Sequence, residues 1–153
     1  ESAPRPNPLI DDAVAKGAKL ACGGRPAGAT MSATIVDHVT RDMKIFDEET
    51  FGPVTTIVRV KGDQEAVAVA NDTAYGLSAG VFCKDVMRAL NVALQIDTGA
   101  CHVNGATAQN EAQAPYGGTK DSGYGRFDGR AVIDEFTELK WITIEPAGQQ
   151  YPV

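Results

Sequence analysis

Apolar residues follow two different periods along the chain, one typical of helices and one typical of strands. From Val86 to Ala93 they recur at helical spacing behind Asp85, which predicts an amphipathic helix with an aspartate N-cap. From 54 to 60 the residues alternate with the two-residue period of a strand. The same criteria predict further helices: one that ends at Gly17, one over 64–71 with Asp63 as its N-cap, and one over 130–136. They also predict strands over 19–22, 34–39, 78–83, 100–103 and 139–145.

The order of these elements predicts the fold class. Between 54 and 103 the pattern is strand, helix, strand, helix, strand with short links, which favours parallel crossover units and therefore an α/β fold. The regular pattern then stops, and 104–129 is a long stretch rich in glycine, asparagine, glutamine and serine. A loop of this length that leaves the carboxyl end of a strand is a candidate for ligand contact.

Composition and charge exclude several classes of protein. The 153 residues suffice for one compact domain, and no apolar run is long enough to cross a bilayer, so we expect a cytoplasmic protein with no membrane partner. The net charge of −6 and the lack of a basic cluster argue against a nucleic-acid partner. Two histidines and no Cys-x-x-Cys pair leave little from which to build a metal site, so we expect none.

The three cysteines are an odd number, which favours free thiols over a disulfide framework. Cys101 is followed by His102, a pair that resembles a nucleophile with its base. Neighbours on a strand point to opposite faces, however, so this pair is not expected to act together. Cys22 and Cys83 are expected to be packed thiols, and we assign no catalytic residue to this chain.

The 16 glycines gather late in the chain, above all over 117–126. This cluster matches neither the order of a phosphate-binding P-loop nor a dinucleotide fingerprint, because Asp128 stands where the third glycine would be. We therefore expect the glycines to allow positive φ angles and close approach of the backbone.

An acidic turn over 47–53 has two interpretations. It contains Glu49 and Phe51 directly before a predicted strand. A solvated acidic turn is favoured from local chemistry. The alternative is a carboxylate that accepts both hydroxyls of a ribose beside an aromatic ring that packs on a planar base.

Several segments in order resemble the C-terminal part of the aldehyde dehydrogenase superfamily, from about Ile10 to Ile144. The matching segments are Gly17-Ala-Lys-Leu with Gly23-Gly24, Glu48-Glu-Thr-Phe-Gly-Pro-Val54, Ala70-Asn-Asp-Thr-Ala-Tyr-Gly-Leu77, Gly99 with Val103-Asn104, Pro115-Tyr-Gly-Gly118 with Lys120, Ser122-Gly123 and Gly125-Arg126, and Glu135-Phe-Thr-Glu-Leu-Lys140. Within the family, the sequence of residues 101–105 and 110–113 looks most like the branch that oxidises salicylaldehyde, vanillin and benzaldehyde.

The resemblance implies oxidation of an aldehyde to a carboxylic acid with NAD or NADP, through a cysteine thioester that a glutamate-activated water hydrolyses. It implies four cofactor-binding residues: Glu49 on the nicotinamide ribose, Phe51 beside the nicotinamide, and Leu77 and Tyr116 near the cofactor or the substrate. It implies a substrate tunnel lined by the loop over 105–109, with these residues: Gly105, Ala106, Thr107 and Gln109.

The resemblance also implies a division of the chain. Residues 9–136 would form the C-terminal part of the catalytic domain, 137–146 an oligomerisation strand in a homo-oligomer, and 1–8 and 147–153 tails. The nucleophilic cysteine, the general-base glutamate, the oxyanion asparagine and the Rossmann domain of the family all lie upstream of this segment. We therefore expect a fragment that is inactive alone. The alternative is a non-catalytic binding or assembly module that keeps the fold.

Overall fold

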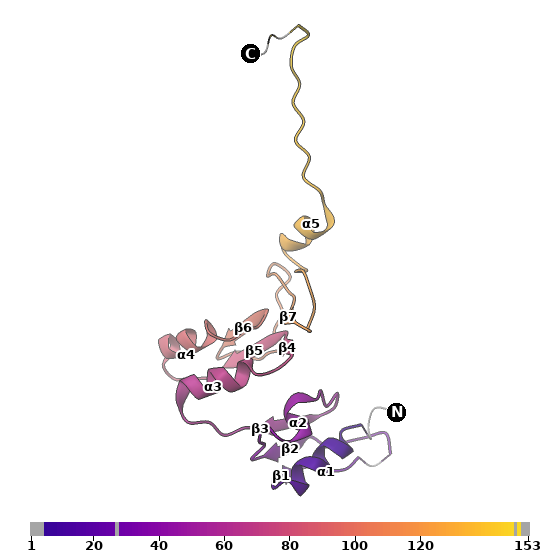
Figure 1. Cartoon of the computed structure of the whole chain (residues 1–153), viewed down its shortest axis with the longest axis vertical. Coiled ribbons are helices and arrows are strands. Elements are labelled where there is room, and N and C mark those ends of the chain that lie inside the picture. Colours follow the sequence, from indigo (N-terminus) through magenta and orange to yellow (C-terminus); the bar gives the residue numbers. More distant parts are fainter. Residues whose placement is uncertain (1–4, 27, 149, 151–153) are drawn as a thin grey trace.

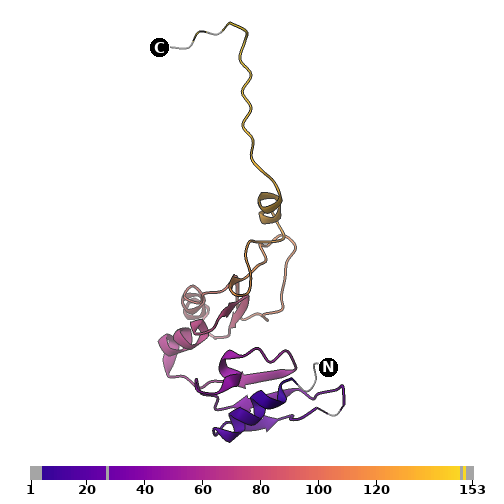
Figure 2. The same ribbon diagram turned by 45° about the vertical axis from the view of Figure 1, so that its right-hand side comes forward.

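A computed structural model describes residues 5–26, 28–148 and 150 of the chain (Figure 1). The first part is a three-stranded sheet with the order β1-β2-β3, formed by Lys19–Cys22, Thr34–Asp37 and Val54–Ile57. Strands β1 and β2 are antiparallel, whereas β2 and β3 are parallel with Thr34 opposite Val54. Helices α1 (Asn7–Ala15) and α2 (Lys44–Asp47) lie beside this sheet in both ribbon views (Figure 2).

The buried core of the described residues lies almost wholly in this first part. Its members come from α1, β2 and the segment around α2: Leu9, Ile10, Ala13, Ala18, Val36, Val39, Met43 and Ile45. The sequence predicts one apolar face of this helix over Ile10, Ala13 and Val14. Ile10 and Ala13 are buried as expected, whereas Val14 is 46% exposed. Gly17 follows the helix with a φ of 104°. The predicted strands over 34–39 and 54–60 are shorter in the structure. Strand β2 ends at Asp37, directly before His38, whose φ is 60°. Strand β3 ends at Ile57, the residue opposite Asp37.

The second part contains helix α3 (Gly62–Asn71) and a crossover unit. Strands β5 (Ser78–Val81) and β6 (Ala100–Val103) pair in parallel, and helix α4 (Val86–Ala93) connects them. This confirms the predicted crossover over 78–103. One detail of the prediction is wrong, because β3 belongs to the first sheet and does not pair with β5.

Two short strands were not predicted from the periodicity of the sequence. They are β4 (Tyr75–Gly76) and β7 (Thr119–Lys120), which pair antiparallel and bring the glycine-rich segment against the start of the crossover unit. The described part of the chain ends with helix α5 (Ala131–Phe136) and an extended segment.

The predicted caps of the two central helices have different outcomes. Asp85 caps α4 as predicted, since its carboxylate accepts hydrogen bonds from the backbone N–H groups of Met87 and Arg88 at 3.0 and 3.1 Å. The predicted cap at Asp63 is wrong, because α3 begins at Gly62, two residues before the predicted start, and Lys61 is its N-cap. Asp63 instead accepts two hydrogen bonds from the Arg88 guanidinium, at 2.6 and 2.8 Å. This pair links α3 to α4, and the Arg88 hydrogen bond lowers the pKa of Asp63.

The predicted strand over 139–145 is not formed. Residues 137–146 run away from the body in an extended conformation, and the side chains of Leu139 and Trp141 are fully or almost fully exposed. A single extended segment cannot be a stable strand without a neighbour that takes up its backbone hydrogen bonds. No helix within the described residues is long and apolar enough to span a membrane.

Candidate nicotinamide-ribose site

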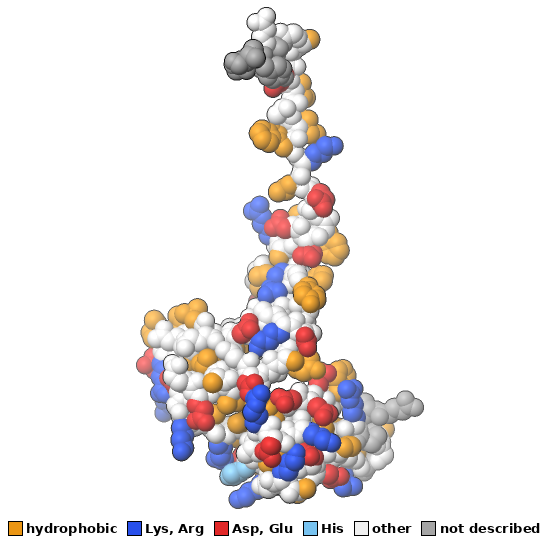
Figure 3. Space-filling view, in the orientation of Figure 1, with side chains coloured by type: hydrophobic (Ala, Val, Ile, Leu, Met, Phe, Trp, Pro, Cys, Tyr) orange, Lys and Arg blue, Asp and Glu red, His pale blue; other side chains and the backbone are white. Residues whose placement is uncertain are grey.

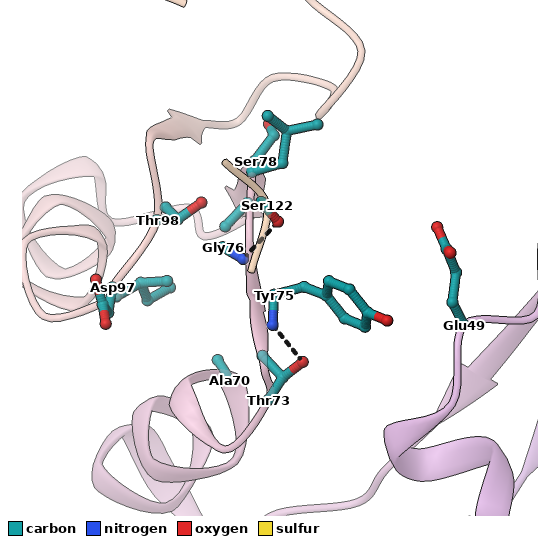
Figure 4. Close-up of a pocket in the computed structure, with 12 residues that line it drawn as sticks. Glu49, Ala70, Thr73, Tyr75, Gly76, Ser78, Asp97, Thr98 and Ser122 are labelled. Carbon is teal, nitrogen blue, oxygen red and sulfur yellow. Dashed lines mark hydrogen bonds between the residues drawn. The ribbon is translucent and has the colours of Figure 1, made fainter. Parts of the chain in front are cut away.

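A cavity of about 410 Å³ lies where the turn after α2 faces strand β4 (Figure 4). Glu49 borders it on one side, and the opposite wall carries Tyr75 and Leu77. Its remaining wall residues come from α3, β4, β5, the 96–98 turn and the glycine-rich segment: Ala70, Thr73, Gly76, Ser78, Ala79, Ile96, Asp97, Thr98 and Ser122. The cavity thus combines apolar and hydroxyl side chains with two carboxylates, and of these Glu49 comes from the first part of the fold whereas Asp97 comes from the second.

Hydrogen bonds to the backbone of Gly76 fix the wall around β4. The Gly76 N–H donates to the Ser122 hydroxyl at 2.9 Å, and the Gly99 N–H donates to the Gly76 carbonyl at 2.9 Å. The Thr119 hydroxyl donates to the same carbonyl at 3.3 Å. The glycine-rich segment, the turn before β6 and strand β4 are therefore joined at one residue.

Lys120 anchors this junction to the end of helix α3. Its ammonium donates to the carbonyl of Asn71 at 2.9 Å and lies 3.6 Å from the carboxylate of Asp97. A cation at the C-terminal end of a helix satisfies a carbonyl that has no partner within the helix. The Asn71 side chain in turn donates to the Gln95 carbonyl and accepts from the Asp97 N–H, both at 2.8 Å. These contacts hold the 95–97 turn in place as one side of the cavity.

The structure brings together two of the four predicted cofactor residues, Glu49 and Leu77, which border the same cavity. Phe51 and Tyr116 do not line it. Phe51 has a φ of 48° and is 63% exposed, with the Arg5 guanidinium 5.6 Å from its ring centre. Tyr116 exchanges backbone hydrogen bonds with Phe127 at 2.7 and 2.6 Å. The two rings are exposed at the surface of the described chain and do not line this cavity.

The predicted substrate loop packs on strand β5, directly after Leu77. The Ser78 hydroxyl donates to the Thr107 carbonyl at 2.9 Å. Within the loop, the Gln109 N–H donates to the Ala106 carbonyl at 3.2 Å. At Gly80 an added Cβ would lie 3.0 Å from the Gly105 carbonyl oxygen, so strand and loop are in close contact. The predicted substrate loop thus contacts strand β5, and Leu77 directly precedes the same strand.

Asn104 sets the start of this loop. It has a φ of 56°, and its side-chain amide accepts from the Cys83 N–H at 2.9 Å and donates to the Cys83 carbonyl at 3.0 Å. The paired bonds to a single residue of the neighbouring segment fix the direction in which the chain leaves β6.

None of the three thiols borders the cavity. All three are free, and Cys83 and Cys101 are partly buried. The expectation of a packed thiol is wrong for Cys22, which is exposed in the first sheet. Burial raises the pKa of the Cys101 thiol, which reduces the share of thiolate, the reactive form, at neutral pH. Among the described residues, no group of three or more His, Cys, Asp or Glu side chains could hold a metal ion.

The prediction of site residues missed Tyr75 and Ser122. Both stand in segments that carry the family resemblance, but nothing in the periodicity marks them. Ser122 contributes through its bond to the backbone of Gly76, and Tyr75 through a side chain that borders the cavity. The signal that could have found Tyr75 is a tyrosine, an aromatic residue with a polar end, next to a glycine at the start of a strand.

The comparison with known proteins shows the family of this chain. The model of the aldehyde dehydrogenase family matches residues 2–142, so the chain belongs to that family. Salicylaldehyde dehydrogenase of Pseudomonas putida is 65% identical over 99% of this chain. Vanillin dehydrogenase of Pseudomonas sp. strain HR199 is 48% identical over 95% of it. The chain spans about a third of the length of these relatives, 31% and 30% respectively.

Solved structures confirm the α/β fold. A salicylaldehyde dehydrogenase from Pseudomonas putida G7, crystallised with salicylaldehyde, superposes with a TM-score of 0.92 at 64% identity and covers 99% of this chain, which spans 31% of it. A Mycobacterium tuberculosis aldehyde dehydrogenase in complex with NAD+ superposes with a TM-score of 0.85 at 34% identity. The superposition covers 98% of this chain and 32% of the Mycobacterium chain.

Proposed function

We propose that this chain supplies the nicotinamide-ribose contact and part of the substrate passage of an NAD(P)-dependent aldehyde dehydrogenase that oxidises an aromatic aldehyde to a carboxylic acid. The observation that carries the proposal is the shared cavity of Glu49 and Leu77, in a chain 65% identical to a salicylaldehyde dehydrogenase. The two residues come from separate parts of the fold, so their convergence does not follow from sequence proximity.

The residues present fit a nicotinamide riboside. A carboxylate accepts hydrogen bonds from two neighbouring hydroxyls, and Glu49 places one at the mouth of a cavity whose far wall includes Leu77 and Ile96. The exposed ring of Phe51 is available to pack against a planar base, with Arg5 on one of its faces. When bound, the nicotinamide accepts the hydride that leaves the substrate carbon. The chain's part is to hold the riboside in one orientation.

The substrate side of the proposal depends on the loop over 105–109. Its contacts with Ser78 and Gly80 hold it on β5, beside the wall that carries Leu77. Tyr116 lies further along the same long segment between β6 and β7, and this aromatic residue is 38% exposed. A relative that is 64% identical over 99% of this chain is complexed with salicylaldehyde in its crystal structure, which supports an aromatic aldehyde as substrate.

We further propose that the nucleophilic thiolate comes from residues outside this chain, so that the chain alone does not oxidise aldehydes. The positions of Cys22, Cys83 and Cys101 away from the cavity support this. A non-catalytic binding or assembly module with the same fold is the competing function, and activity in a complete enzyme separates the two.

The test uses a hybrid enzyme, in which this chain replaces the matching segment of the Pseudomonas putida salicylaldehyde dehydrogenase. We expect the hybrid to produce NADH from salicylaldehyde at a rate within about tenfold of the parent enzyme, because the two segments are 65% identical. The 153-residue chain alone should produce none. A folded hybrid without activity would favour the binding module, and steady NADH production by the chain alone would contradict the division of roles.

We also propose that residues 137–146 pair with a second copy of the chain. Figure 3 shows hydrophobic side chains along the extended segment, and four are at least two-thirds exposed: Leu139, Trp141, Ile142 and Ile144. An extended segment with exposed apolar side chains is suited to strand addition.

Light scattering of the 153-residue chain at rising concentration tests this. We expect the mean mass to rise with concentration, and the double variant Trp141→Lys/Ile144→Lys to shift the rise at least tenfold higher. The matched control is Phe82→Lys, which removes a ring that is 72% exposed elsewhere and should leave the association unchanged. A mass that stays monomeric at every concentration would refute the pairing.

A further inference from the structure

We propose that Tyr75 is a second cofactor-binding residue, whose phenol binds the nicotinamide ribose opposite Glu49. The inference rests on the proposed function, because it assumes that the riboside enters this cavity. It adds a residue from β4 to a site whose carboxylate comes from the other part of the fold.

The geometry places the two side chains across one opening. Figure 4 shows the ring of Tyr75 extending from β4 toward the carboxylate of Glu49, with open space between them. Both residues border the main cavity, and both also border a neighbouring one of about 380 Å³. Leu77 lines only the first of these. Tyr75 and Glu49 therefore form the two sides of the passage where the cavities meet.

The backbone of Tyr75 is fixed, whereas the end of its side chain is free. Its N–H donates to the Thr73 hydroxyl at 3.2 Å, and it stands opposite Lys120 in the β4–β7 pair. Lys120 is itself anchored to helix α3 through Asn71. The residue is 44% exposed, and within the described part of the chain neither its hydroxyl nor the Glu49 carboxylate makes a hydrogen bond. A rigid support with a free polar end is what a preorganised binding group requires.

The chemistry of the two groups is complementary to a pair of neighbouring hydroxyls. A carboxylate can only accept, so the hydroxyls of a ribose donate to Glu49. A phenol can donate as well, so Tyr75 can give a hydrogen bond to an oxygen of the same ribose while the sugar remains bound to Glu49. Phenylalanine at this position keeps the ring and loses only the hydroxyl, which makes the contribution of the hydrogen bond measurable.

The experiment compares Tyr75→Phe, Glu49→Gln and a control in the hybrid enzyme. The control is Tyr124→Phe, which removes a phenol hydroxyl from a residue that is 94% exposed and lines neither cavity. NADH is the probe, and its dissociation constant is measured by fluorescence titration without aldehyde, beside KM for NAD+ and kcat. Loss of one neutral hydrogen bond corresponds to about a three- to tenfold change in affinity.

We expect Tyr75→Phe to raise the NADH dissociation constant and KM for NAD+ about three- to tenfold, with kcat within twofold and Tyr124→Phe unchanged. In the double variant the two effects should be less than multiplicative, because both groups hold one sugar. If Glu49→Gln weakens NADH and Tyr75→Phe does not, the role of Tyr75 is refuted and the proposed function stands. If neither weakens NADH, both are refuted. A fall in kcat alone would indicate a structural role and also overturn the inference.

Discussion

Replacement of Glu49 by glutamine in the hybrid enzyme is expected to lower kcat/KM for NAD+ about 10- to 100-fold, since hydrogen bonds to a charged acceptor contribute about 1.5–3 kcal/mol. The amide keeps the shape of the side chain. It loses the negative charge and replaces one acceptor oxygen by a donor, so one of two ribose hydroxyls has no acceptor. The loss should appear in the orientation of the nicotinamide as well as in affinity, so we expect a slower hydride-transfer step in single-turnover experiments with NAD+ and salicylaldehyde.

The adjacent residue provides the control. Glu48 carries the same charge in the same turn, but it borders only the smaller neighbouring cavity. Glu48→Gln should therefore change kcat/KM less than twofold, which separates a specific contact from a general loss of negative charge. Equal effects of the two substitutions would show that the turn acts only through its charge, and an unchanged Glu49→Gln enzyme would remove Glu49 from the site.

Periodicity predicted the elements that depend on neighbours close in the chain. Helix α4 has one apolar face and an aspartate directly before it, and both its position and its cap are confirmed. The parallel pair of β5 and β6 follows from the same local pattern, because a crossover helix brings its two flanking strands together.

Contacts between distant segments were not predictable in this way. The β4–β7 pair consists of two residues on each side, too few for a period to show, and the segments lie far apart in the sequence. Asp63 has the residue type and place of a cap, but Arg88 on the next helix binds its carboxylate. The strand expected over 139–145 has the composition of a strand, but it joins none of the sheets that the described residues form.

For the site, residue type alone left Glu49 undecided between a solvated turn and a ribose ligand. The resemblance to the family favoured the ligand. The structure shows that Glu49 stands in an exposed turn and also borders the cavity, so its role as a ribose ligand stays a prediction. Tyr75 was missed because its importance comes from what it faces across the opening. That relation exists only after the two parts of the fold are brought together.

The glycines were expected to allow close backbone approach, and Gly99 shows the most severe case. An added Cβ there would overlap the carbonyl group of Gly117 and lie 3.1 Å from the Cα of Gly118. These are backbone atoms, which cannot rotate out of the way as a flexible side chain can. The same contact presses the glycine-rich segment against the turn before β6, where Gly99 also donates to Gly76. A side chain at this position would push apart the junction that forms the cavity wall.

Gly99→Ala is therefore expected to destabilise the 153-residue chain by about 3 kcal/mol, the upper end of the usual cost of overpacking, as measured by denaturant unfolding. The control is Gly17→Ala, where the strain comes from the backbone angle and not from overlap. The φ of 104° at Gly17 disfavours a side chain, but no atom lies within 4 Å of the added Cβ. Conformational strain of that kind costs about 1 kcal/mol. The loss at Gly99 should thus exceed the loss at Gly17, because backbone overlap displaces two segments and an unfavourable φ strains only one residue. An equal or smaller loss at Gly99 would mean that the two segments separate easily, and the wall of the cavity would then not be fixed by this contact.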